Sequence, residues 1–197
     1  MTAPINDFTA ESQHRYQVRF DVGCDGAHRI GESAHLLIWC DALATMPVPL
    51  DALPAHLQII DARFGASGAI AQQLLAVQAA RGERTMVAVI AAGSPGSAAQ
   101  GSAAPGSAAQ GIPIEDHLLA GAVVDALGAV GIDATSPEAA VAAAAFQGLR
   151  GAVGHLITAS VGGQAFVAER GPEAMRAARG RWESSDLMVV RRGEMPV

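Results

Sequence analysis

Apolar and polar positions alternate or cluster along the first half of the chain in a way that predicts four strands. Alternation in RYQVRFDVG, residues 15–23, predicts a strand that ends at Gly23. The nearly continuous apolar run AHLLIWCDA, residues 34–42, is typical of a strand buried on both faces. LQIIDARFG, residues 57–65, and TMVAVIAAG, residues 85–93, predict a third and a fourth strand.

Helical periodicity separates the last two of these strands and dominates the second half of the chain. SGAIAQQLLAVQAARGER, residues 67–84, places Ile70, Leu74 and Val77 on one helical face and so completes a strand–helix–strand unit. Further helices are predicted over 114–130 and 137–149.

The chain also carries a helix-start signal and a closing strand. Thr135-x-x-Glu138 has the spacing of a capping box for the helix at 137, and SDLMVVRR, residues 185–192, predicts a returning strand. Strands that alternate with helices indicate an α/β fold, a three-layer domain with a mixed or mostly parallel sheet flanked by helices. We expect residues 1–197 to form a single such domain.

A low-complexity insert at about 95–111 interrupts this pattern. GSAAQGSAAPGSAAQG, residues 96–111, repeats a short unit rich in glycine, serine and alanine, which buries too little apolar surface to fold alone. We interpret it as a flexible loop expansion near the carboxyl end of a strand. The alternative is a mobile lid over a site there.

Composition and charge argue against a nucleic-acid partner and a structural zinc site. Aromatic residues make up 4 % of the chain and the net charge is −6, so neither stacking platforms nor a basic surface for nucleic acid is expected. Cys24 and Cys40 are too few for a structural zinc site, and two buried reduced thiols are favoured over a disulfide.

The sequence favours a cytoplasmic protein without membrane segments. The first residues lack a basic stretch followed by an apolar run, as a signal peptide would have. Residues 85–114 are uncharged, but glycine, serine, proline and glutamine interrupt them, so they are not expected to span a bilayer. Homo-oligomerisation is left open.

The candidate functional residues lie where strands are expected to end. Open α/β sheets bind ligands outside the carboxyl ends of their strands, so these positions are considered first. Asp41 ends the second strand, GASGA at 65–69 opens a helix, and Glu115 and Asp116 open another. The amides of a helix start suit an anion. Each group has a structural alternative, since strand-end acids form turns or caps and acids in a first turn offset the helix dipole.

Three further side chains have simpler interpretations. His117 lies beside the acid pair and could be a ligand or an acid–base group, but neighbouring helical positions diverge, so we expect it to face solvent. Trp39 and Trp182 are expected to be packing residues. The chain contains no GxSxG and no HExxH motif.

Four stretches, taken in order, resemble one known family. YQVRFDVGCDGAHRIGESAHLLIWCDAL and GASGAIAQQLLAVQAARGERTMVAVIAAG carry the first half of the likeness, and GGQAFVAERG with SSDLMVV carries the end. IEDHLLAGAVVDAL is the most specific, with Glu115, Asp116, Ala120 and Gly121 in the family's pattern. Together they resemble the 2-phosphosulfolactate phosphatase family, especially its actinobacterial-type members.

The resemblance implies a magnesium-dependent phosphatase that acts on a small anionic phosphate ester. It implies Asp41, Glu115 and Asp116 as catalytic residues and Mg²⁺ ligands. The phosphate oxygens would be bound at Gly65, Ser67 and Gly68, by the amides around the helix start, as substrate-binding residues.

The chain also departs from the family's pattern. Gln164 stands where relatives place an arginine, and Ser94 replaces the acid of the family's Ala-Gly-Glu turn. Arginines commonly clamp phosphate dianions, so these losses leave a second hypothesis open. In that hypothesis the chain is a degenerate non-catalytic paralogue that acts as a binding or interaction protein. A third hypothesis is an unrelated α/β binding domain.

Overall fold

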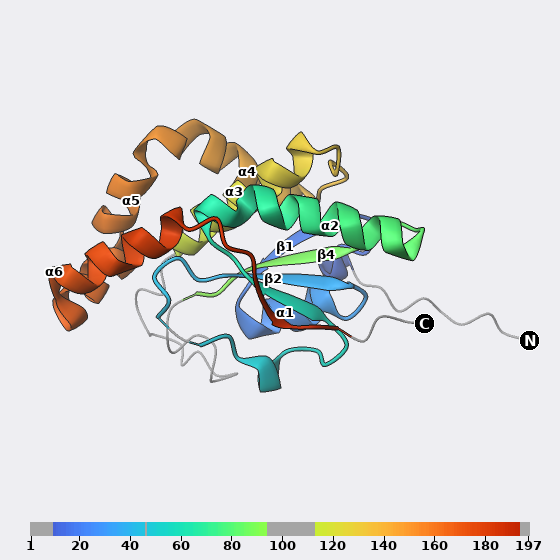
Figure 1. The fold of residues 1–197 in the computed structure, drawn as a ribbon, viewed down its shortest axis with the longest axis horizontal. Helices are drawn as coiled ribbons and strands as arrows, with labels where there is room; N and C mark the ends of the chain where they lie inside the picture. The colour runs from blue at the N-terminus through green and yellow to red at the C-terminus, as the bar shows by residue number, and fades with distance from the viewer. Residues whose placement is uncertain (1–9, 46, 94–112, 194–197) are drawn as a thin grey trace, which may run out of the picture.

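A five-stranded sheet forms the centre of the protein in a computed structural model, which describes residues 10–45, 47–93 and 113–193 (Figure 1). The strand order is β1-β4-β2-β3-β5. The first four strands are parallel to their neighbours, and β5 pairs antiparallel with β3. The strands are β1 (Val18–Val22), β2 (Leu36–Cys40), β3 (Gln58–Asp61), β4 (Val87–Ala91) and β5 (Met188–Arg191).

Helices cover both faces of this sheet, so the predicted α/β class with a mostly parallel sheet is confirmed. In Figure 1 α2, α3 and α4 lie over one face, and α1 lies over the other. The long helices are α1 (Gly23–Gly31), α2 (Ser67–Arg81), α3 (Ile114–Ala129), α4 (Pro137–Leu149), α5 (Val153–Ala159) and α6 (Val161–Glu183). Short 3₁₀ turns are η1 (Ala10–Ser12), η2 (Leu50–Ala52), η3 (Phe64–Ala66) and η4 (Arg150–Ala152).

The central strands are apolar throughout because both of their faces are buried. Every residue of β2 and β4 is buried. Alternate side chains of β2 enter different cores: Ile38 packs with the α2 and α3 residues Leu74 and Val123, whereas Trp39 packs with Ile30 of α1. The prediction that Trp39 is a packing residue is therefore confirmed.

The start of α4 corrects one detail of the predicted helix signals. The N-cap is Ser136, whose hydroxyl oxygen accepts a hydrogen bond from Ala139 N at 3.2 Å. Thr135, the predicted cap, instead bridges to Val18 at the edge of β1. The capping pattern predicted the correct helix but the wrong cap, because two hydroxyl residues stand side by side.

Two helical features were not visible in the sequence pattern. α1 contains three glycines, which disfavour a helix, but Gly26 lies so close to Asp21 that a side chain there would overlap the carboxylate. α6 is two helices joined by a kink at Gly171, where φ is +83° and Pro172 follows. Cys24 and Cys40 are buried free thiols, as predicted. The insert at 95–111 lies outside the described residues.

The free edge of β1 is closed by a side chain that imitates a neighbouring strand. The Gln13 amide donates to Phe20 O at 2.9 Å and accepts from Phe20 N at 3.1 Å, so it satisfies both backbone groups. Ala134 O and Ser136 N pair with Val18 in the same way. This edge therefore offers few unpaired groups to another chain.

One stretch, Pro137–Ala159, is long and apolar enough to cross a bilayer by length and composition alone. In the structure η4 divides it into α4 and α5. Alanine supplies much of its hydropathy, and exposed alanine is ordinary on protein surfaces.

The close approach of α3 and α4 gives a first prediction. A Cβ at Gly121 would overlap the carbonyl oxygen of Ala142, so Gly121→Ala should lower the free energy of unfolding by about 1–3 kcal/mol through overpacking. Gly128→Ala on the same helix is the control, because nothing lies within 4 Å of that position. Urea unfolding of both variants tests this, and equal stabilities would contradict the close packing.

Candidate functional site

Asp116 links helix α3 to the two central strands at their carboxyl ends. Its Oδ1 accepts a hydrogen bond from Ala42 N at 2.9 Å, and its Oδ2 accepts one from Gly93 N at 3.0 Å. Ala42 follows β2 and Gly93 follows β4, so one carboxylate closes the crevice between adjacent parallel strands. This is the position where open α/β sheets bind anionic ligands, and here the chain's own carboxylate occupies it.

Burial sets the electrostatics of this carboxylate. Only 3 % of Asp116 is exposed, and desolvation raises its pKa well above the ordinary value for an aspartate. The nearby Asp41 and Glu115 charges raise it further, whereas the two backbone hydrogen bonds oppose the rise. The ionised form of Asp116 is therefore costly unless a cation lies nearby.

Asp41 lies in a turn that the end of α6 holds in place. Arg181 Nη2 donates to the backbone oxygen of Asp41 at 3.0 Å, and Trp182 Nε1 donates to Ala42 O. The Asp41 carboxylate itself is buried and accepts from Thr45 Oγ1 at 3.2 Å. Together with the Asp116 bond to Ala42 N, these contacts fix the peptide that follows β2.

Glu115 points to a different place from Asp116. Its carboxylate lies against Gly162 in the first turn of α6, so closely that a side chain there would overlap it. A carboxylate at a helix N-terminus compensates the helix dipole. Glu115 is 7 % exposed, and the glycine is what lets it approach the helix.

The sequence analysis did not single out Asp61, which interacts electrostatically with Arg181, Arg63 and Asp41. Asp61 ends β3 beside β2, and Arg63 and Arg181 both act electrostatically on it. Burial raises the pKa of Asp61, with a small rise from Asp41, and the two arginines oppose this. The rule that selected Asp41 as a strand-end acid would also have selected Asp61, whereas Arg181 lies 140 residues from Asp41 and carries no local signal.

The two arginines contain buried polar atoms that lack partners. Nε of Arg63 and Nε of Arg181 are both buried without a hydrogen-bond acceptor in the described part of the chain. Buried donors of this kind are uncommon in folded proteins, because desolvation without a partner costs free energy.

The predicted phosphate-binding segment is only partly open. A side chain at Gly65 would meet the carbonyl oxygens of Glu183 and Ser184, and the Ser67 hydroxyl donates to Arg63 O at 3.4 Å. Gly68 has open space beside it in the first turn of α2. Of these three predicted residues, Gly68 leaves the most room for a ligand, and substrate binding by all three stays a prediction.

The predicted magnesium ligands can be compared with this geometry. Among residues 10–45, 47–93 and 113–193, no group of three or more His, Cys, Asp or Glu side chains is arranged to hold a metal. Asp116 spends one lone pair of each oxygen on a backbone amide, and Glu115 faces α6. Asp41 and Asp61 interact electrostatically, and one or two carboxylates suffice for a mostly hydrated Mg²⁺.

His117 is only partly exposed, whereas the sequence predicted that it faces solvent. Its ring contacts the Phe20 ring edge-on, with centroids 4.7 Å apart, and burial lowers its pKa. Nδ1 of His117 is buried and lacks a partner among the residues that the structure describes. The difference arises because Phe20 of β1 packs on this side of α3, which no local pattern shows. Trp182 is buried, as predicted for a packing residue.

Comparisons with known proteins add no family to this description. No family model matches the chain, and neither a curated protein nor a solved structure matches it significantly.

The buried acid gives a second prediction, on stability and pH. Because folding raises the pKa of Asp116, the folded chain holds a proton that the unfolded chain releases, so stability should fall as pH rises through that window. Asp116→Asn removes this dependence. The stability of the native sequence relative to the variant should decline as the pH rises above about 4, the ordinary pKa of an aspartate.

Urea unfolding at several pH values measures this difference. Asp51→Asn, at an exposed acid in η2, controls for the loss of a charge elsewhere. A relative stability that stays constant or increases with pH would contradict the account of Asp116.

Proposed function

We propose that the protein is a magnesium-dependent phosphatase of small anionic phosphomonoesters, similar in substrate to 2-phosphosulfolactate phosphatases. Its site lies at the carboxyl ends of β2 and β3. The observation that carries this proposal is the meeting of two strand-end acids, Asp41 and Asp61, with two arginines, Arg63 and Arg181, whose buried Nε atoms lack acceptors. The family resemblance of the sequence points to the same reaction.

Charge decides which ligand this site favours. Two carboxylates beside two guanidinium groups make a site that can hold a cation and an anion side by side. A phosphomonoester dianion is repelled by carboxylates alone, but guanidinium groups bind its oxygens with paired hydrogen bonds. Arg63 and Arg181 thus take the part of the arginine that the family resemblance would place at Gln164.

The position of each side chain suggests its role. Arg63 immediately precedes η3 and α2, so a phosphate that it binds would also lie near the helix start and the open space beside Gly68. Arg181 is anchored through Asp41 O, which fixes the guanidinium relative to the acid. Such fixed donors stabilise the charge that develops on the transferred phosphoryl group.

Magnesium would be held by Asp41 and Asp61, and when bound it would neutralise phosphate charge and orient a water for attack. Asp116 keeps the turn after β2 in place through Ala42 N and so positions Asp41. The low exposure of Asp41 and Asp116 excludes bulk water from this side of the site.

A second candidate function is the non-catalytic binding protein. The observation in its favour is that Asp116 and Glu115, the most specific match to the family, both have structural tasks: one bonds two strand ends and the other faces α6. Such a protein would keep the anion site of Arg63 and Arg181 and lack turnover.

The third prediction separates these functions by activity. Phosphosulfolactate, phospholactate and an aryl phosphate should be hydrolysed with magnesium and not with chelator. Asp41→Asn and Asp61→Asn should each lower kcat/KM about 100-fold or more. Arg181→Lys should have a similar effect, because the fixed planar fork is lost.

Arg179→Lys is the matched control, an exposed arginine two residues away on the same helix, and should leave activity unchanged. Turnover that survives both chelation and Asp41→Asn would overturn the assignment of this site. Phosphate binding that depends on Arg181, without turnover on any ester, would favour the binding protein.

A further inference from the structure

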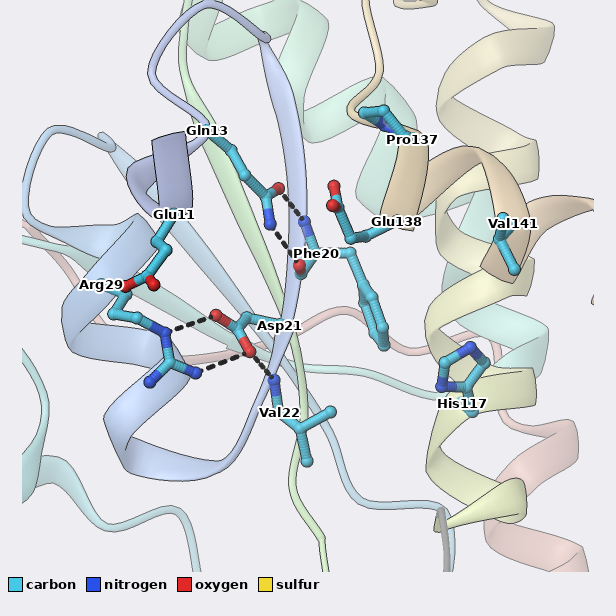
Figure 2. Close-up of a pocket in the computed structure, with 10 residues that line it drawn as sticks. All are labelled: Glu11, Gln13, Phe20, Asp21, Val22, Arg29, His117, Pro137, Glu138 and Val141. Carbon is cyan, nitrogen blue, oxygen red and sulfur yellow. Dashed lines mark hydrogen bonds and ion pairs between the residues drawn. The ribbon is translucent and has the colours of Figure 1, made fainter. Parts of the chain in front are cut away.

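A cavity lies beside the edge strand β1, away from the ends of β2 and β3. Its volume is about 590 Å³, in the range of small-molecule sites. Figure 2 shows η1, β1 and α1 on one side and the helices α3 and α4 on the other. The lining residues that matter are Glu11, Phe20, Arg29, His117, Glu138 and Val141.

One part of the cavity wall is aromatic and apolar. The Phe20 ring and the His117 ring meet edge-on at 79° between their planes, and Figure 2 shows Phe20 directed toward His117. Val22 and Val141, which are 37 % and 64 % exposed, extend this apolar wall at its margin. A ligand with an apolar body fits this wall.

Acidic side chains outnumber basic ones in the cavity wall. Asp21 and Arg29 neutralise each other through two hydrogen bonds of 3.0 Å. Glu11 and Glu138 remain as additional carboxylates, and Figure 2 shows the Glu138 carboxylate directed from α4 toward β1. No hydrogen bond or ion pair engages Glu138 within the described part of the chain. The cavity therefore attracts a cation and repels an anion.

The structure argues against an added peptide strand as the occupant. Both backbone groups of Phe20 pair with the Gln13 amide, and those of Val18 pair with Ala134 and Ser136. Val22 N donates to Asp21 Oδ1 at 2.8 Å. A strand could pair with this edge only after displacing these groups.

We propose that this cavity is a binding site for a small organic cation, an amine with an apolar or aromatic body. The body packs on Phe20 and Val141, and the ammonium group is bound by Glu138 with Glu11 adding attraction. The Phe20 ring face adds a cation–π contribution when the ammonium approaches it. This site is independent of the proposed phosphatase site, and its test uses no phosphate.

Benzylamine is the probe for this proposal, and benzyl alcohol and benzoate are its neutral and anionic counterparts. Titration near pH 7, followed by amide chemical shifts in ¹⁵N-labelled protein, should give millimolar binding of benzylamine that maps to Phe20, Val22, His117 and Val141. Benzyl alcohol should bind more weakly, and benzoate should cause no such shifts. No response to benzylamine, or equal binding of benzoate, would overturn the proposal.

Glu138→Gln tests the role of the carboxylate. The variant should weaken benzylamine binding roughly two- to fivefold, as expected for a partly exposed ion pair. Glu169→Gln, an exposed acid on α6, removes the same charge elsewhere and should leave binding unchanged. Melting curves of both variants exclude a loss of fold. An equal loss in both variants, or shifts that map outside the cavity, would show attraction by net charge alone and overturn the site.

Discussion

The hydrogen bonds from Ala42 N and Gly93 N to the Asp116 carboxylate are the constraint on which the rest of the structure depends. They join residues 74 and 23 positions apart in the sequence and bring α3 onto the ends of β2 and β4. Because α3 then packs closely on α4 through Gly121, the position of α4 beside β1 also follows. Burial of the Asp116 carboxylate costs free energy, and its two hydrogen bonds from backbone donors offset only part of the desolvation.

The turn after β2 also connects Asp116 to α6. Ala42 donates to Asp116 and accepts from Trp182, and Asp41 O accepts from Arg181. Glu115 meets the other end of α6 at Gly162. The two neighbouring acids of α3 thus divide their tasks: Asp116 orders the sheet edge, and Glu115 orders the helix. In our proposal the metal ligands are instead Asp41, which follows β2, and Asp61, which ends β3.

The sequence predicted the strands and the helices over 67–84, 114–130 and 137–149 well, because periodic burial leaves a pattern in consecutive residues. It failed where a residue's surroundings come from distant segments. His117 was expected in solvent, but it is only partly exposed because its ring packs on Phe20 of β1. Arg181 donates to Asp41 O across 140 positions of the sequence, and the glycine at position 26 lets α1 approach Asp21 closely.

The central claim is that Asp41 and Asp61 bind a cation while Arg63 and Arg181 bind a phosphate. A crystal structure grown with manganese in place of magnesium and with inorganic phosphate tests it most directly, because manganese is located by its anomalous scattering. Our account predicts one manganese peak between the two carboxylates and phosphate density on the two arginines. Manganese bound elsewhere, or phosphate that contacts neither arginine, would contradict it.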